Sequence, residues 1–217
     1  MKRFSSVIVA LFMFASVSFA QNASYVSTME STIKSFENAR TLDEISASTA
    51  TFERINSAEP NAWLPAYWAS FANMNLSFLE KDLAKKDAFL DKAEKLCQHA
   101  SKLQPKNDEI AVLKANIANA RMAVDPATRW EKYGELVKVN AREAKSINPE
   151  NPRLQLLEAQ TIFYTPAEYG GGKQKAIPAV KESIVKFEKF KPESNIHPNW
   201  GEKRAKLMLA ECEKEGK

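Results

Sequence analysis

Four prolines recur at nearly equal spacing along this chain: Pro60, Pro105, Pro149 and Pro192. Successive prolines stand 45, 44 and 43 positions apart, and each follows a helix-patterned stretch and begins a short polar turn. A fixed period of about 20 to 50 residues is typical of proteins built from stacked repeats rather than around one closed core. Such stacks usually present a surface for partners. The spacing therefore predicts an architecture before it predicts an activity.

Alignment of the helices on the four prolines gives matching columns of residues. Five residues before the prolines stand Ile55, Ala100, Ala144 and Phe187, and twelve before stand Ser48, Ala93, Val137 and Val180. The columns two and eight residues before each proline belong to the same stripe along one face of the helix. This stripe is apolar everywhere except at Ser48. Ten residues after the first three prolines stand Ser70, Ala115 and Ala159, whose small side chains let two helices approach closely.

The repeating unit is thus a helix with a small-residue contact, a connection, a second helix with an apolar stripe, and a proline turn. The pattern predicts helices near residues 24–39, 41–57, 63–80, 84–103, 107–124, 126–147, 152–164, 173–190 and 199–214. No strand-like alternation persists along the chain. The last helix has a polar face and is expected to cap the stack. The turn before it is expected to bring Trp200 down over the last repeat.

The column of Ala93, Cys97, Ala100, Leu103 and Pro105 resembles the second helix of a tetratricopeptide repeat (TPR). The resemblance extends over about residues 41–210. It implies an all-α fold, a right-handed superhelix of stacked TPR-like helical hairpins with a C-terminal capping helix. The period of this chain, about 44 residues, exceeds the usual 34 of the family, so longer helices or connections are expected. HEAT and armadillo arrays have the longer period but do not explain a proline after every second helix.

Residues 1–20 have the features of a cleavable signal peptide. Lys2 and Arg3 precede an apolar run over residues 7–19, and Ser18 and Ala20 place small side chains where a signal peptidase reads the chain. Cleavage between Ala20 and Gln21 leaves residues 21–217 as a TPR-like helical repeat domain. That domain is expected to be periplasmic or secreted. No later segment has the roughly 18 to 20 apolar residues of a membrane span.

Composition and side-chain spacing exclude several classes of function. The chain has a net charge of +4, and its lysines and glutamates are interleaved, whereas a nucleic-acid binder gathers its basic residues on one face. His99 and His197 lack further ligands at metal-binding spacing, so no metal site is predicted. Cys97 and Cys212 fall in different repeats, so buried thiols are expected rather than a disulfide.

No catalytic constellation can be assembled from the sequence, so an enzyme is not predicted and no cofactor is expected. The glycine cluster that follows Tyr169 and ends at Gly172 lacks the spacing of a phosphate-binding loop. It is interpreted as a flexible connection between the two helices of the fourth repeat. A resemblance to a loop of some exported bacterial TPR-like proteins, the solute-transport-associated lipoproteins among them, also implies a structural role.

The TPR resemblance implies that the first helix of each pair lines the concave face. Carried over by offset from the prolines, this predicts a partner-binding surface made of Tyr67, Phe71, Met74, Asn116, Asn119, Gln160 and Phe163. The simpler alternative is that Tyr67 and Phe71 fill space between repeats. Aromatic rings followed by amides suit an extended peptide, whose side chains the rings bury and whose backbone the amides bind. The spaced lysine, asparagine and arginine set that captures acidic C-termini is absent.

We therefore predict a non-catalytic exported scaffold that binds a protein or peptide of the cell envelope on its concave face. The alternative is a small-ligand binding component associated with envelope transport, which would hold a small solute in a pocket within the curl of the stack.

Overall fold

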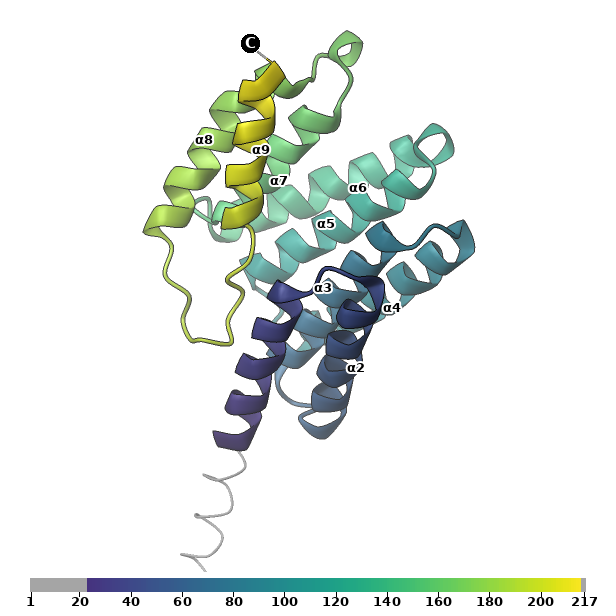
Figure 1. The fold of residues 1–217 in the computed structure, drawn as a ribbon, viewed down its shortest axis with the longest axis vertical. Helices are drawn as coiled ribbons and strands as arrows, with labels where there is room; N and C mark the ends of the chain where they lie inside the picture. Colours follow the sequence, from purple (N-terminus) through teal and green to yellow (C-terminus); the bar gives the residue numbers. More distant parts are fainter. Residues whose placement is uncertain (1–22, 216–217) are drawn as a thin grey trace, which may run out of the picture.

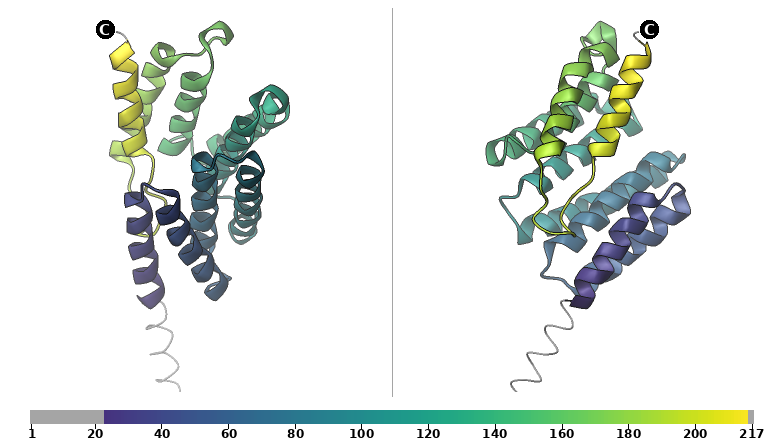
Figure 2. Two further views of the ribbon diagram at one scale, coloured as in Figure 1. Left: turned by 45° about the vertical axis from the view of Figure 1, so that its right-hand side comes forward. Right: turned by 60° about the vertical axis from the view of Figure 1, so that its left-hand side comes forward.

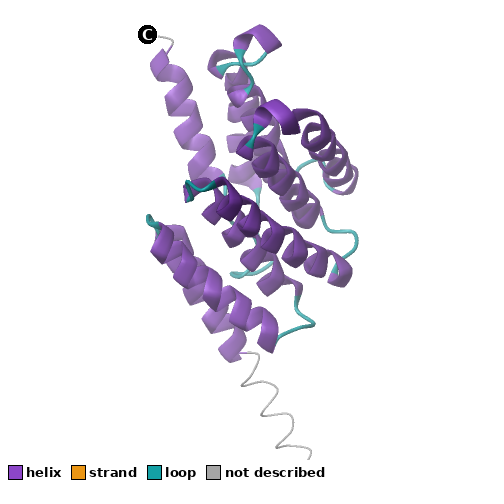
Figure 3. Ribbon diagram, turned by 90° about the vertical axis from the view of Figure 1, so that its right-hand side faces the viewer, coloured by secondary structure: helices purple, strands orange, loops and turns teal. Residues whose placement is uncertain are grey.

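The computed structural model describes residues 23–215, and over this range the chain is helical and contains no β-strand (Figure 1 and Figure 3). A first helix covers residues 23–38. The remaining elements are α2 (Leu42–Ala58), α3 (Trp63–Leu79), α4 (Leu83–Leu103), α5 (Asp108–Val124), α6 (Pro126–Ile147), α7 (Pro152–Tyr164), the 3₁₀ turn η1 (Ala167–Tyr169), α8 (Lys173–Lys189) and α9 (Glu202–Glu215). The predicted all-α class is confirmed. The predicted signal peptide, residues 1–20, lies outside the described residues.

Each helix predicted from the pattern is present. The largest shift is at the start of α9, which was expected at residue 199 and begins at Glu202. Within the described range, no helix combines the length and the apolar character that crossing a membrane requires.

Helices α3 and α4, α5 and α6, and α7 and α8 form three hairpins that lie side by side (Figure 1 and Figure 2). The helix over residues 23–38 and α2 cover one end of the array, and α9 covers α8 at the other. Pro60 stands in the turn before the first of these hairpins, and Pro105 and Pro149 stand in the turns between successive hairpins, as predicted. Pro192 does not: it lies in a long loop of residues 190–201, which leaves α8 and returns toward the N-terminal half before α9 begins (Figure 2).

Side-chain caps explain why several helices begin where they do. Thr41 and Glu44 form a reciprocal capping box at α2. Asp82, Asn107 and Asn151 each accept a hydrogen bond from a backbone N–H in the first turn of α4, α5 and α7. Each such side chain satisfies a donor that the helix itself cannot, and a cap of this kind typically contributes about 1 kcal/mol.

The columns seen in the sequence are the contacts between helices. The columns five and twelve residues before the prolines are buried at all their positions. Ser70, Ala115 and Ala159 are fully buried, and the Ser70 hydroxyl donates to the Ala93 carbonyl of α4 at 2.7 Å. The column two residues before the prolines is not buried throughout, because Ala58 and Ile147 are exposed. The small-residue contact therefore brings the two helices of a hairpin together, as predicted.

The two cysteines are buried and are not joined in a disulfide, in agreement with the prediction. Cys97 belongs to an N-terminal apolar cluster that includes Phe52 and Trp68, whereas Cys212 belongs to a C-terminal cluster with Val180 and Met208. The glycine-rich segment joins α7 to α8. Gly170 and Gly172 have positive φ angles of 86° and 110°, which side chains rarely adopt.

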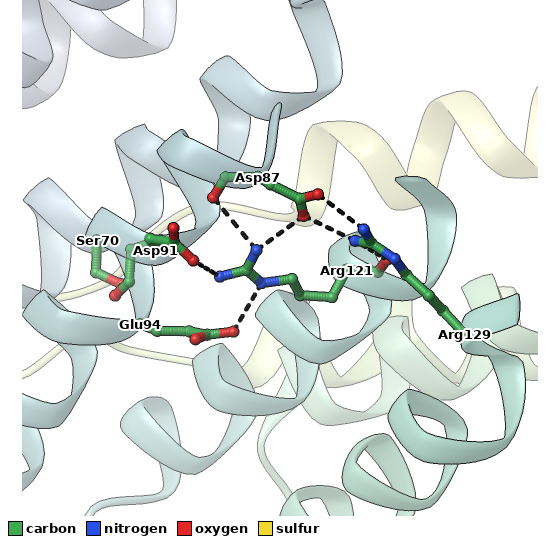
Figure 4. A network of polar contacts seen from close by, with 7 residues as sticks. Ser70, Asp87, Asp91, Glu94, Arg121 and Arg129 are labelled. Atoms are coloured by element: carbon green, nitrogen blue, oxygen red, sulfur yellow. Dashed lines mark hydrogen bonds and ion pairs between the residues drawn. The ribbon is translucent and has the colours of Figure 1, made fainter. Parts of the chain in front are cut away.

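Arg121 of α5 lies almost buried at the centre of an ionic network (Figure 4). Its guanidinium donates to Asp87 at 2.8 Å and to Glu94 at 2.9 Å, and it also contacts Asp91. Arg129 of α6 donates to both carboxylate oxygens of Asp87 at 2.7 Å. The network therefore ties α4 to both helices of the next hairpin.

Replacement of Arg121 by Met should lower the free energy of unfolding by about 2 to 4 kcal/mol, because three carboxylates lose the cation that they surround. Urea denaturation followed by circular dichroism measures this loss. The matched control is Arg142→Met, since Arg142 pairs with Glu135 at the exposed surface. It should change stability by less than about 0.5 kcal/mol. Equal effects of the two variants would contradict the role given to Arg121.

Asp87 gives the network a pH dependence. Hydrogen bonds from Arg129, and then from Arg121, lower the pKa of Asp87 from 3.8 to about 2. Since the folded pKa lies below the unfolded one, the stabilisation is present above about pH 4 and is lost as the pH falls through 2. The Asp87→Asn variant should be less stable than the parent by about 1 to 2 kcal/mol near pH 6. The gap should close toward pH 2, and a gap that stays constant in urea titrations down to pH 2 would refute this assignment.

Candidate binding cavity

A cavity of about 800 Å³ opens between α3, α5, α7 and the start of α9. Its volume falls in the range typical of small-molecule and cofactor sites, about 300 to 1,000 Å³. Aromatic, apolar and amide side chains make up most of its lining: Phe71, Met74, Asn75, Phe78, Asn116, Asn119, Met122, Leu156, Gln160, Tyr164 and Trp200. Among the described residues that line it, Arg204 carries the charge. The cavity is therefore a large, mostly apolar space whose described lining carries a single cation.

Five of the seven residues predicted for the concave face line this cavity: Phe71, Met74, Asn116, Asn119 and Gln160. The structure brings them together from three helices, because they occupy equivalent positions in successive hairpins. The other two lie elsewhere. Tyr67 is completely buried beneath the cavity, and Phe163 packs into the C-terminal cluster with Met208. Whether any of the seven contacts a partner remains a prediction.

Some of the cavity residues that the sequence analysis did not predict follow the same spacing from the prolines. Asn75 and Tyr164 both stand fifteen residues after a proline, and Phe78 and Ala123 both stand eighteen after. Extending the predicted stripe by one helical turn would have found them. Trp200, Gly201 and Arg204 carry no such signal, since they come from outside the hairpins.

Trp200 forms the floor of the cavity. Its ring stacks on Phe71 of α3, with centroids 4.4 Å apart and planes inclined by 19°. Its indole N–H donates to the hydroxyl of Tyr67 at 2.9 Å. The ring also packs against a cluster that includes Leu154 of α7, so Trp200 covers part of the last repeat, as expected, and reaches α3 as well. The chain between α8 and α9 is long enough to carry this ring back to the first complete hairpin, where an aromatic surface is available to bury it.

Two further contacts hold the loop of residues 190–201 against the N-terminal half. The indole N–H of the fully buried Trp68 donates to the carbonyl of Ile196 at 2.8 Å. The ring of His197 packs edge-on against Trp63, with centroids 5.2 Å apart. The loop is thus anchored at several points before it delivers Trp200 to the cavity.

Arg153 fastens the same loop from the other side. Its side chain is fully buried, donates to Glu109 of α5 at 2.8 Å, and donates to the carbonyl of Pro198. The guanidinium also lies 5.5 Å from the centre of the Trp200 ring. Burial raises the pKa of Glu109 above its usual range, and the attraction of Arg153 opposes that shift. The ion pair positions Trp200 from beneath, without itself lining the cavity.

The cavity lining contains no histidine or cysteine among the described residues. His99 contacts the Pro60 carbonyl, and His197 sits in the anchored loop. No group of three or more metal-ligating side chains of the His, Cys, Asp and Glu types occurs within residues 23–215. The lining is suited to burying a flat apolar molecule against aromatic rings and to contacting a polar group at one edge.

A solved structure, the HusA haemophore from Porphyromonas gingivalis, superimposes with a TM-score of 0.77 and is 30% identical in sequence. The match covers 89% of this chain and 94% of HusA. The protein belongs to the same family as HusA. No protein-family model matches the sequence, and a search of curated proteins gives no significant match.

Membership of the HusA family fits the helical fold but does not by itself assign the repeats to a type. HusA is a haemophore, which is a binding protein. The expectation of a helical binding protein is therefore supported.

Gly201 is the residue on which the position of Trp200 depends most directly. It has a φ angle of 114°, and a Cβ atom there would lie 2.5 Å from Cζ of Phe187. Gly201→Ala should therefore cost about 2 to 4 kcal/mol of stability and shift the tryptophan fluorescence. Thermal unfolding and emission spectra measure both effects.

The matched control is Gly134→Ala in the middle of α6. The nearest atom to a Cβ there is the Met122 sulfur at 4.0 Å, so the methyl group fits. Because alanine is the better helix former, this variant should be more stable than the parent by about 0.5 to 1 kcal/mol. Parent-like stability and emission of Gly201→Ala would show that the loop tolerates a side chain at this point.

Proposed function

We propose that this protein binds haem, or a closely related porphyrin, in the cavity between α3, α5, α7 and α9. It acts as a carrier and not as an enzyme. The observation that carries the proposal is a cavity of about 800 Å³, lined by aromatic and apolar side chains, in a chain related to a haemophore over nearly its whole length.

The residues present fit such a ligand. A porphyrin is a broad, flat and mostly apolar ring system that carries acidic groups at one edge. Trp200 and Phe71 already stack as a pair at the floor, and Phe78 and Tyr164 stand exposed at the rim. Aromatic faces of this kind contribute both buried area and ring stacking. Met74 and Leu156 complete an apolar surface beside them.

The iron of haem is held in proteins by histidine, cysteine, methionine or tyrosine. Met74, Met122 and Tyr164 are the lining residues with such ligand atoms. Met74 is buried, whereas Met122 is partly exposed and Tyr164 is exposed. Met122 and Tyr164 are therefore the residues available to an iron atom. The apolar surface, which does not depend on a metal, is expected to supply most of the binding energy.

The shape of the site favours this ligand over the peptide predicted from the sequence. An extended peptide needs an open groove along the first helices of successive hairpins. Trp200, Gly201 and Arg204 line the C-terminal side of that face and close the space in part. A compact ligand fits this enclosure better. The small-ligand alternative is thus preferred, and peptide binding is the competing outcome.

The proposal also includes export of the protein and the TPR-like nature of its hairpins. A carrier of this kind suits an exported protein, periplasmic or secreted, that has lost residues 1–20 as a signal peptide. The TPR-like nature of the hairpins is proposed on the proline spacing and the small-residue columns, whose buried contacts support it.

Filling the cavity should abolish binding. Ala123 lines the cavity at the exposed end of α5, so Ala123→Trp places a large ring in the ligand space without disturbing the core. Titration of haemin into the parent protein should produce a saturable change in its absorbance spectrum. The variant should bind at least 10-fold more weakly at unchanged thermal stability.

The control is Ala127→Trp, an exposed position in the first turn of α6 that does not line the cavity. It should bind haemin as the parent does. Failure of the parent to bind haemin would refute the proposal. Equal binding by the parent and both variants would show that haemin binds at another surface.

A further inference from the structure

Arg204 stands in the first turn of α9 and lines the cavity together with Gln160, Tyr164 and Trp200. Its side chain is about one-third exposed. The described lining otherwise consists of apolar, aromatic and amide residues, and it contains no carboxylate. A cation in such surroundings attracts an acidic group more strongly than the same cation in open water, because the local dielectric is lower.

The guanidinium of Arg204 is held in position by two neighbours. One terminal nitrogen donates to Glu211 of the same helix at 3.0 Å, and the other donates to the hydroxyl of Tyr164 at 2.5 Å. Glu211 does not line the cavity, whereas Tyr164 does. A guanidinium carries five N–H donors in a planar fork. The two contacts therefore orient Arg204 without using all of its donors, and the contact on the cavity side is to a neutral hydroxyl.

Resting on the proposed function, we infer that Arg204 binds a carboxylate of the ligand and makes the cavity selective for flat apolar acids. A carboxylate replaces the Tyr164 hydroxyl on the guanidinium and accepts charge-assisted hydrogen bonds from the fork. The phenol of Tyr164 is then released toward the ligand. The apolar body of the ligand packs against the stacked pair of Trp200 and Phe71, and its acidic edge lies at α9. For a porphyrin, the group in question is a propionate side chain.

A purely structural role is the competing explanation, in which Arg204 only ties α9 to α7 through Tyr164. The two roles differ in their dependence on the ligand. A tether affects the binding of every ligand equally, whereas a carboxylate site distinguishes an acid from its ester. Comparison of one ligand in two chemical forms, in the parent and in an Arg204 variant, therefore separates the two roles.

The probes are haemin and haemin dimethyl ester, titrated under identical conditions into the parent protein, Arg204→Gln and Tyr164→Phe. The parent should bind the acid about 10- to 100-fold more tightly than the ester, in line with charge-assisted hydrogen bonds. In Arg204→Gln the two forms should bind within about 2-fold of each other. Tyr164→Phe removes the competing hydroxyl and should keep the preference for the acid.

The control variant is Arg142→Gln, which removes a positive charge from the exposed face of α6 and should keep the full preference. Equal binding of acid and ester by the parent would overturn the inference while leaving the proposed function intact. A preference that survives in Arg204→Gln would assign the carboxylate to another group and leave Arg204 as a tether. Binding of neither form by the parent would refute the proposed function itself.

Discussion

The buried pair of Arg153 and Glu109 is the interaction on which the arrangement of this protein most depends. Arg153 is fully buried, and the cost of burying its charge is offset only in part, because its Nε and the Oε2 atom of Glu109 have no hydrogen-bond partner among the described residues. Glu109 supplies the charge, the Pro198 carbonyl accepts a hydrogen bond, and the Phe190 ring lies 4.5 Å from the guanidinium. One side chain therefore joins α5, α7 and the loop before α9. Removal of either charge would leave the other buried and unmatched.

That loop changes what a stack of hairpins can do. In a simple array, each repeat contacts only its neighbours, and the result is an open surface. Here residues 190–201 cross from α8 back to α3, where Ile196 bonds to Trp68 and Trp200 bonds to Tyr67. The crossing places an aromatic floor and the first turn of α9 against the face formed by α3, α5 and α7. An open face thereby becomes a cavity that is closed in part by the loop and the start of α9.

The division of roles within the cavity follows from where its residues originate. The hairpins supply a repeated set of apolar and amide side chains, which bury a ligand but distinguish poorly between apolar molecules. The C-terminal segment supplies the aromatic floor at Trp200 and the cation at Arg204. Selectivity in the proposed carrier therefore depends mainly on a segment outside the repeats. The relationship of the protein to a haemophore and the shape of the cavity both support the proposal of a flat, mostly apolar ligand.

The sequence by itself determined the helices, their turns and the columns that pack between them. These features depend on local periodicity, on capping residues such as Asn107 and Asn151, and on prolines that end each hairpin. It also located Phe71, Asn116 and Gln160, because equivalent offsets in successive hairpins reach the same face. Their neighbours Asn75 and Tyr164 lay one step further along the same pattern.

Only the tertiary structure decided that Tyr67 is buried beneath the cavity, that Phe163 turns into the C-terminal cluster, and that Trp200 lies on α3. The contacts that place Tyr67 and Trp200 join residues more than a hundred positions apart, as does the hydrogen bond from Trp68 to Ile196. No local pattern records such a pairing, because it depends on how far a loop can reach and which buried groups remain to be satisfied once the hairpins have packed.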